Sequence, residues 1–194
     1  KGWQVSKLES IFDILGGHAF KSKDYTDKGV FVLRTKNFND GVAVHLKDDV
    51  FLPESFLESY QSFICEVFDY HLVMVGASIG KTGMIFPSMI PALRNQNMWC
   101  FRPKEAKYSK VFTKFIVDIV SKKLLGFASG SARDFFRKED FRSHKLVMPR
   151  EEILNSFRSI TDPILTKMSN NLEEIKIMTN LRDTLLPKLI SGEL

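Results

Sequence analysis

The stretch PILTKMSNNLEEIKIMTNLRDTL, residues 163–185, decides the shape of this protein. No glycine occurs between Glu151 and Ser191, and the apolar residues of the stretch recur in steps of three and four. That spacing places them on one stripe of a long helix, and a stripe of this length favours a packing partner. The stripe comprises Leu165, Met168, Leu172, Ile175, Met178, Leu181 and Leu185.

The helical arm contains a possible break at Pro163. Asp162 is a suitable cap with Pro163 at the first helical position, so the arm is either two helices or one helix with a kink at Pro163. A helix from Pro163 to Leu185 extends roughly 35 Å, more than a body of this size covers. The stripe residues Leu165, Met168, Leu172, Ile175 and Met178 are therefore predicted to pair with a second helix, the alternative being packing against the arm's own body.

Composition limits the class of protein. The 194 residues are 44% hydrophobic with 17 Phe, enough for one substantial domain and an appendage. No apolar run approaches the ~20 residues that span a bilayer, so a soluble protein without a membrane partner is expected. The start Lys1-Gly2-Trp3 suggests a fragment of a longer chain. The two cysteines, Cys65 and Cys100, fit a reducing cytoplasm, and the dispersed His and Cys predict no metal site.

The pattern before the arm predicts an α/β (α+β) fold. A strand-rich globular domain is expected over residues 1–149 and a helical, coiled-coil-forming arm over residues 150–194. Strands are predicted at 29–33, 42–44, 72–75, 84–86, 98–101 and 146–148, and helices at 6–12 and 109–125. Gly126 to Ser131 is predicted to be a loop of small residues.

Two motifs resemble catalytic sites and are rejected. Gly76-Ala77-Ser78-Ile79-Gly80-Lys81-Thr82 has one residue too few between its glycines for a phosphate-binding loop, and it leads into a predicted strand where a helix is needed. Asp162 with Glu174 and Lys176 mimics a nuclease motif, but its carboxylates lie more than three helical turns apart. The chain therefore offers no catalytic residues.

The arm ends in residues 181–194, LRDTLLPKLISGEL, which closely resemble the C-terminus of the specificity (S) subunit of Type I restriction–modification systems. The body resembles the target recognition domain of the same family, in the same order along the chain. The segments that carry this likeness are Gly2-Trp3, residues 17–25, residues 29–37, Leu72 to Gly83, Asn95-Gln96-Asn97-Met98-Trp99, residues 129–132 and Leu146 to Pro149. His71 departs from the family's usual Asp, at a position expected to be structural.

The resemblance implies a function and a set of partners. A recognition domain reads one half of a bipartite double-stranded DNA site, and paired spacer helices fix the gap between half-sites. Two methyltransferase (modification) subunits and the motor–nuclease (restriction) subunits dock on the S subunit. S-adenosylmethionine, ATP and Mg are bound by those partners, so no cofactor is expected on this chain. Its arm is expected to pair with the N-terminal half of the same S subunit, or with a second copy of this fragment.

DNA contacts are predicted on loops between strands, where a rigid body presents polar side chains. Lys and Arg bind phosphates, whereas Arg, Asn and Gln read base edges. The net charge of +5 permits this function without proving it. The predicted contacts are Lys21, Lys23, Lys36, Asn37, Lys81, Arg94, Asn95, Ser129, Ser131, Arg133 and Arg137.

Two alternatives stay open. In the first, a half-length S protein forms a homodimer that reads a palindromic bipartite site. In the second, the chain is a coiled-coil adaptor without a nucleic-acid role, and its basic loops are incidental. Loss of DNA affinity on charge reversal separates the adaptor from both DNA readers.

Overall fold

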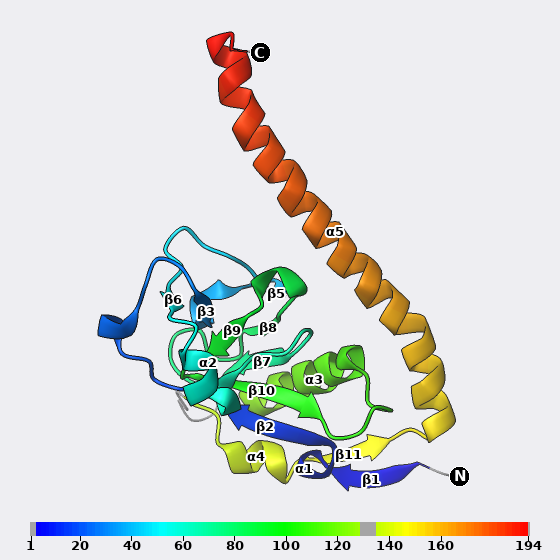
Figure 1. Ribbon diagram of the computed structural model, residues 1–194. Helices are drawn as coiled ribbons and strands as arrows, with labels where there is room; N and C mark the ends of the chain where they lie inside the picture. The colour runs from blue at the N-terminus through cyan, green and yellow to red at the C-terminus, as the bar shows by residue number, and fades with distance from the viewer. Residues whose placement is uncertain (1–2, 129–134, 194) are drawn as a thin grey trace.

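In the computed structural model, which describes residues 3–128 and 135–193, the body is built on a six-stranded sheet (Figure 1). The strands lie in the order β2-β10-β7-β8-β5-β4, and all neighbours are antiparallel except β5 and β8. Their bounds are β2 (Phe12–Gly16), β4 (Phe38–Asn39), β5 (Gly41–Ala43), β7 (Tyr70–Val73), β8 (Thr82–Met84) and β10 (Met98–Pro103). Because the neighbours alternate in direction, the ends of β2 and β7 meet the starts of β8 and β10 at one edge.

A second sheet of three strands lies against one face of the first. It has the order β6-β3-β9, with β3 (Val30–Leu33) in the middle, β6 (Phe51–Leu52) and β9 (Ala92–Arg94). Side chains of β3 alternate as a strand requires: Phe31 and Leu33 join the core between the sheets, whereas Val30 and Val32 face a layer of loops. That loop layer contains η1 (Ser22–Asp24), α2 (Phe56–Ser59) and η3 (Gln61–Phe63), whereas η2 (Thr35–Asn37) is bonded to the 44–49 segment.

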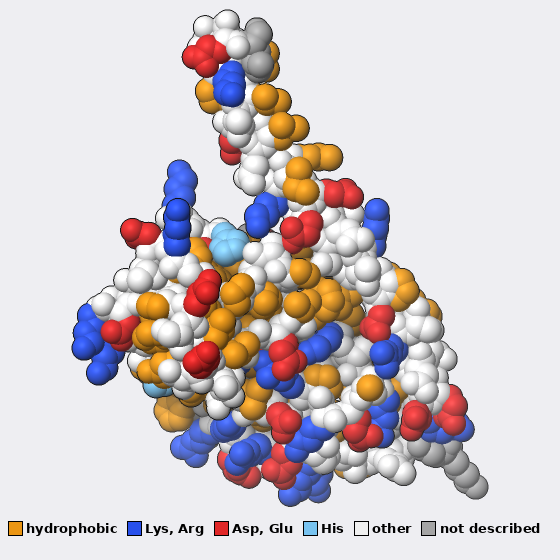
Figure 2. Space-filling model, in the orientation of Figure 1, with side chains coloured by type: hydrophobic (Ala, Val, Ile, Leu, Met, Phe, Trp, Pro, Cys, Tyr) orange, Lys and Arg blue, Asp and Glu red, His pale blue; other side chains and the backbone are white. Residues whose placement is uncertain are grey.

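The arm is one uninterrupted helix, α5 (Glu151–Ser191), which leaves the body and projects far beyond it (Figure 1). Its 41 residues correspond to a length of roughly 60 Å. The helix begins at Glu151 and continues through Pro163, so the prediction of one helix is confirmed and the alternative of two helices is wrong. At Pro163 the missing amide leaves the carbonyl of exposed Ser159 to water, which the surface of an arm tolerates. Figure 2 shows apolar side chains along the arm and where it leaves the body.

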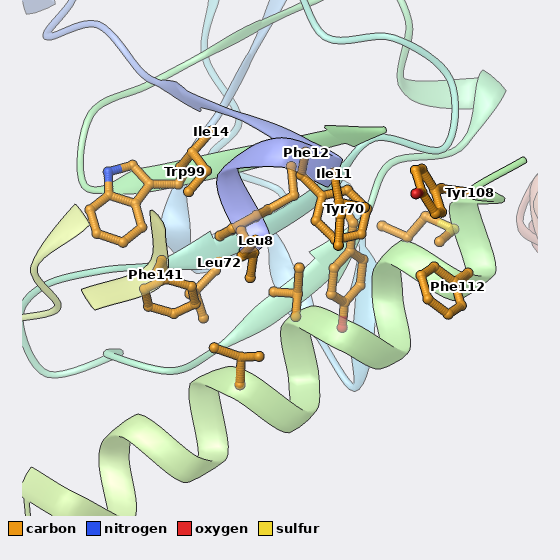
Figure 3. Close-up of a cluster of buried hydrophobic side chains, with 14 of the residues drawn as sticks. Leu8, Ile11, Phe12, Ile14, Tyr70, Leu72, Trp99, Tyr108, Phe112 and Phe141 are labelled. Atoms are coloured by element: carbon orange, nitrogen blue, oxygen red, sulfur yellow. The ribbon is translucent and has the colours of Figure 1, made fainter. Parts of the chain in front are cut away.

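The largest core lies between the six-stranded sheet and helix α3 (Lys110–Ala128). Tyr70 and Leu72 of β7 point toward Val117 and Val120 of α3. Two short helices, α1 (Leu8–Ile11) and α4 (Lys138–Arg142), close the core at one side with Phe141 (Figure 3). The base of α5 completes it, because Leu154 and Leu165 are buried there. The predicted domain boundary at residue 149 stays a prediction. The base of the arm, although it lies beyond this boundary, belongs to the body's core.

A two-stranded sheet ties the start of the chain to the root of the arm. β1 (Gln4–Lys7) pairs antiparallel with β11 (Lys145–Met148), so that Gln4 faces Met148. Only two residues separate β11 from α5. The direction in which the arm leaves the body is therefore set partly by the N-terminal strand.

The mixed α/β fold with a long C-terminal helix is confirmed, as are the strands near residues 30, 72, 84, 98 and 146 and helix α3. The helix predicted at 6–12 is reduced to α1, because β1 precedes it and Phe12 already begins β2. η4 (Pro87–Met89) follows β8. Among residues 3–128 and 135–193, no helix combines the length and apolar character that crossing a membrane requires.

Candidate nucleic-acid interface

Four segments converge where β2 and β7 end and β8 and β10 begin. Backbone hydrogen bonds join them: the amide of His18 donates to Arg94 and the amide of Gln96 to His18, each at 3.0 Å. The amide of Met74 donates to Asn97 at 3.0 Å, and the amide of Phe136 to Met74 at 2.8 Å. We call this surface the loop edge and define it as residues 17–29, 74–81, 95–97 and 135–137. It lies at the end of the sheet away from the root of α5 (Figure 1).

Close contact at Gly17 holds the first of these segments in place. A Cβ atom built on Gly17 would lie 1.7 Å from the carbonyl oxygen of Asn95, inside any possible contact distance. Residue 17 must therefore be glycine if residues 17–18 are to run beside the 94–96 turn. This packing fixes residues 17–18 against the 94–96 turn at the loop edge.

Four predicted DNA contacts are exposed at the loop edge. Lys21 precedes η1 and Lys23 lies within it, Lys81 ends the connection between β7 and β8, and Arg137 follows the Val75–Phe135 bridge. The β7–β8 turn is compact because Gly76 and Gly80 have φ angles of +84° and +83°. Exposed ammonium and guanidinium groups on a fixed backbone suit phosphate oxygens spaced along a duplex.

Lys36 is also exposed, but it is already paired with Asp48. Its charge is thereby partly neutralised, so it attracts a phosphate less strongly than an unpaired lysine would. Its role in DNA contact stays a prediction.

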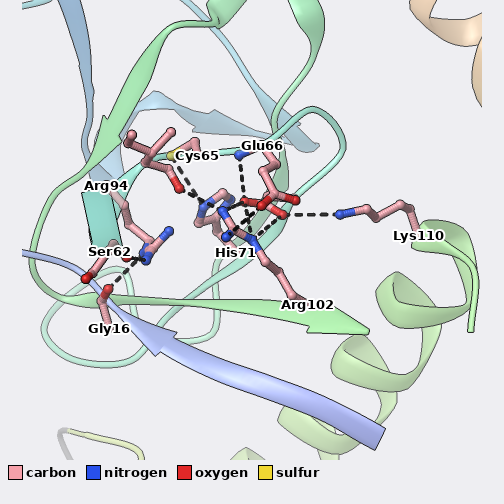
Figure 4. Close-up of polar contacts among 10 residues, drawn as sticks. Gly16, Ser62, Cys65, Glu66, His71, Arg94, Arg102 and Lys110 are labelled. Carbon is pink, nitrogen blue, oxygen red and sulfur yellow. Dashed lines mark hydrogen bonds and ion pairs between the residues drawn. The ribbon is translucent and has the colours of Figure 1, made fainter. Parts of the chain in front are cut away.

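Three other predicted contacts point inward, and for Asn37 and Arg94 the expectation of DNA contact is corrected because neither has exposed surface. Arg94 donates from Nε to Gly16 O at 2.9 Å and from Nη2 to Ser62 O at 3.0 Å (Figure 4). Asn37 donates from Nδ2 to Val44 O and to Asp49 Oδ1, at 3.0 and 2.7 Å. These side chains hold loops together from inside.

Asn95 is buried as well, and its Oδ1 accepts the backbone amide of Gln96 at 2.8 Å. The next two residues, Gln96 and Asn97, are the exposed ones. Their amides match the donor and acceptor pattern of an adenine edge. The structure places the tip of this turn at Asn97, whose φ is +70°, so the exposed amides of the Asn-Gln-Asn run belong to the two residues after the predicted Asn95.

Ser129, Ser131 and Arg133 lie outside the described residues. They follow α3 in the chain and precede Phe135, which bridges to Val75 at the loop edge. Their roles stay predictions.

An aromatic cluster behind the loop edge was missed entirely. The ring of His18 lies 4.9 Å from Phe20, 4.8 Å from Tyr60 and 5.1 Å from Phe63, centroid to centroid. These rings come from segments 40 residues apart, so no local sequence pattern announces them. They support residues 17–24 from beneath, which rigidifies the backbone that carries Lys21 and Lys23.

A buried polar network lies between the two sheets (Figure 4). Asp69 accepts from Arg102 and lies 3.3 Å from the Lys110 ammonium. Although burial alone would raise it, the pKa of Asp69 is lowered by the hydrogen bonds from Arg102 and the Glu66 amide. Burial lowers the pKa of His71 to about 3 and raises that of Cys65 to about 12, so both side chains are neutral.

This network brings together atoms that resemble metal ligands. Oxygen, nitrogen and sulfur atoms of Asp69, His71 and Cys100 lie within 4.8 Å of one another, a grouping that their sequence positions did not suggest. Asp69, however, is occupied by Arg102, and a further cation would meet the guanidinium charges of Arg94 and Arg102. The cluster is better explained as structural, as was expected for His71.

The structure agrees with the rejection of the two motifs that resemble a phosphate-binding loop and a nuclease site. Thr82 begins strand β8, so no helix N-terminus follows the Gly80-Lys81 turn to bind phosphate. Asp162 pairs with Arg158 one turn away on α5, and Glu174 is exposed farther along the same helix.

The residues predicted for helix pairing fall into two groups, one packed against the body and one exposed. Leu165 is buried in the body's core and Leu172 packs partly against it, so the prediction that Leu165 pairs with a second helix is wrong. Met168, Ile175 and Met178 are exposed, and their role in pairing stays a prediction.

Comparison with known proteins matches the chain to a family. A family model described as "Type I restriction modification DNA specificity domain" matches residues 1–184. The chain is similar to the MjaIX specificity subunit of a Type I restriction enzyme from Methanocaldococcus jannaschii, with 23% identity over 100% of the chain and 45% of that protein. The MjaVIII specificity subunit of the same organism is 26% identical over 90% of the chain and 41% of its own length. The chain thus spans about half the length of these relatives.

Solved structures show the same fold. The S subunit of a Type I restriction–modification system from M. genitalium superposes with a TM-score of 0.61 and 17% identity, over 97% of this chain and 46% of that one. The HsdS subunit from Thermoanaerobacter tengcongensis superposes with a TM-score of 0.58 and 16% identity, over 100% of this chain and 46% of that one.

Proposed function

The chain belongs to the Type I restriction modification DNA specificity domain family, and we propose on this premise that its body reads one half of a bipartite DNA site through the loop edge. The observation that carries the proposal is that Lys21, Lys23, Lys81 and Arg137 are all exposed on segments whose backbones are hydrogen-bonded to one another at the loop edge. The exposed amides of Gln96 and Asn97 lie on that same surface.

The division of labour follows from the chemistry of the side chains. The four cations bind phosphates, which supplies affinity, fixes the register and makes binding salt-dependent. Gln96 and Asn97 carry donors and acceptors that discriminate base edges in the major groove. A surface whose loops are hydrogen-bonded to one another loses little conformational entropy when it binds.

The arm supplies the second part of the function. We propose that α5 pairs with a second helix, which holds two recognition bodies at a fixed separation. In this proposal the chain itself is not catalytic. Methyltransferase subunits bring S-adenosylmethionine, and motor–nuclease subunits bring ATP and Mg.

The proposal is tested in the complete methyltransferase complex, by selection from a randomised duplex pool and by mapping adenine methylation in the host genome. One bipartite motif is expected in both experiments, and it should vanish from the genome when the gene is deleted. No enriched motif in the pool and an unchanged methylation map would refute DNA recognition and favour the adaptor.

Variants separate affinity from specificity. Lys81→Ala and Arg137→Ala should each weaken binding to all sequences and reduce the slope of log affinity against log salt by about 1. Gln96→Ala should relax preference at one base pair, by about 1–3 kcal/mol of discrimination. Lys145→Ala is the matched control, since this exposed lysine lies on β11 beside the root of the arm.

A further inference from the structure

The loop edge carries one large apolar side chain among its charges. The side chain of Phe135 is exposed, with 48% of the residue open to water, and among the described residues of the loop edge it is the only large apolar residue in this class. The exposed cations Lys81 and Arg137 belong to the same surface. A single exposed apolar residue is common on proteins and needs no function by itself. The orientation and the neighbours of Phe135 are what indicate a role.

The orientation of Phe135 follows from the residues around it. Its segment is extended, because Phe135 pairs antiparallel with Val75 and Arg137 has φ −90° and ψ 131°. Side chains of an extended segment alternate between its two sides, and Phe136 is buried in the core of the body. Phe135 and Arg137 therefore both point outward. The partly exposed Val75 lies beside Phe135, since residues opposite each other in an antiparallel pair share a face.

Backbone hydrogen bonds place Phe135 near the turn that carries the exposed amides. The amide of Met74 donates to the carbonyl of Asn97 at 3.0 Å, and the carbonyl of Met74 accepts the amide of Phe136 at 2.8 Å. In an antiparallel ladder the N–H and C=O of one residue point to the same side, so Asn97 and Phe136 lie on the same side of Met74. The amide of Asn97 and the ring of Phe135 are thus close together on the loop edge.

One feature of DNA suits an apolar side chain in this position. In the major groove thymine presents a C5-methyl group, which apolar side chains recognise by contact. A wedge inserted between base steps would need a ring that is free on both faces. About half of Phe135 is covered, and its backbone is held by the bridge to Val75. The ring therefore offers one apolar surface, which a methyl group can cover.

We propose that Phe135 packs against the C5-methyl group of a thymine, at or next to the base pair that Gln96 and Asn97 contact. The inference rests on the proposed function, in which the loop edge reads the major groove, and adds a base in the half-site and the side chain that reads it. The amide of Asn97 and the ring of Phe135 together complement an A·T pair, because adenine offers a donor and an acceptor and thymine offers the methyl group.

Uracil substitution tests the contact, because uracil pairs as thymine does and lacks only the methyl group. In the complete methyltransferase complex, the thymines of the selected half-site are replaced one at a time by uracil. One replacement should weaken binding about fourfold, the loss expected when one methyl group is no longer covered. 5-Bromouracil at the same position should restore the affinity, since bromine has nearly the volume of a methyl group.

Variants assign the preference for thymine to Phe135. Phe135→Ala should bind the thymine and uracil duplexes equally, whereas Phe135→Leu should keep part of the preference because leucine retains an apolar surface. Phe115→Ala is the matched control: Phe115 is 47% exposed but lies on α3, outside the loop edge, so the fourfold preference should stay intact. The ratio of the two affinities is internal to each variant, so a small loss of stability does not affect it.

The outcomes separate the inference from the proposed function. A selected half-site without thymine, equal affinity for thymine and uracil at every position, or a preference that survives in Phe135→Ala would overturn the inference, while the selected motif upholds the proposed function. A complex that selects no motif refutes the proposed function, and the inference falls with it.

Discussion

The carboxylate of Asp69 lies 2.6 Å from Nη2 of Arg102, and Asp69 is fully buried where the 64–69 loop meets β10. Arg102 also donates to the carbonyl of Ile64 at 2.7 Å, so one guanidinium fastens the loop to the sheet. Asp69→Asn should lower the free energy of unfolding by about 3 kcal/mol, because it leaves Arg102 and Lys110 without their buried counter-charge. Urea titration measures this loss. Asp13→Asn, which breaks an exposed pair with Lys104, should cost under about 1 kcal/mol.

His71 makes the stability depend on acid. Its pKa is about 3 in the folded protein and about 6.5 when unfolded, so the unfolded chain binds the proton first as pH falls. Neutral His71 makes its full contribution to the free energy of unfolding above about pH 6.5, and this contribution is progressively lost as the pH falls toward 3. Between pH 7.5 and 5 the loss should be about 2 kcal/mol.

The control for His71 is a comparison of slopes. Thermal or urea unfolding at both pH values should show a smaller difference for His71→Asn than for the original chain, whatever the variant's absolute stability. Equal differences would mean that His71 binds its proton equally well in the folded and the unfolded protein, so that folding does not lower its pKa.

Adjacent glycines should respond in opposite ways. Gly17→Ala places a methyl group against the Asn95 carbonyl and should destabilise the protein by about 2 kcal/mol, because backbone must move. It should also weaken DNA binding, since the 17–29 and 95–97 segments separate. Gly16→Ala meets no atom within 4 Å and should be nearly neutral in melting and in DNA binding. Equal effects at both positions would contradict the close approach.

Lys36 and Asn37 are neighbours with different roles. Asn37→Ala should cost about 2–3 kcal/mol, because it leaves the amide of Arg34 without its acceptor and removes one hydrogen bond each from the carbonyl of Val44 and the carboxylate of Asp49. Lys36→Ala breaks only an exposed ion pair and should cost under about 1 kcal/mol. Chemical denaturation ranks the stability losses of the two variants. A larger loss for Lys36→Ala would contradict the structural role of Asn37.

The helices and strands predicted correctly from the sequence are those whose own residues show the apolar periodicity of a helix or a strand. β3 alternates between two cores, and α3 buries one side of a regular helical repeat, so local periodicity sufficed. β1 has no such pattern: three of its four residues are exposed, and it exists because β11 pairs with it. Pairing between segments 140 residues apart leaves no local mark.

The site was harder to predict than the fold. Lys81 and Arg137 lie on loops as their charge suggested, but Arg94 is fully buried among carbonyls from Gly16 and Ser62. No local rule reveals a buried arginine whose acceptors lie 78 and 32 residues away. On the arm, Leu165 and Ile175 belong to one periodic stripe in sequence, and only the position of the body separates a covered face from an open one.

The pairing of Gln4 with Met148 means that the globular part begins and ends at the same place. The chain between these two residues leaves and returns at one point, and the root of α5 adds a second attachment through Leu154 and Leu165. Such a unit can be exchanged for another of the same fold, provided that β1 and β11 still pair and that the new body still covers Leu154 and Leu165 of α5. If the body reads DNA as proposed, such an exchange would change the sequence that is recognised and leave helix α5 unchanged.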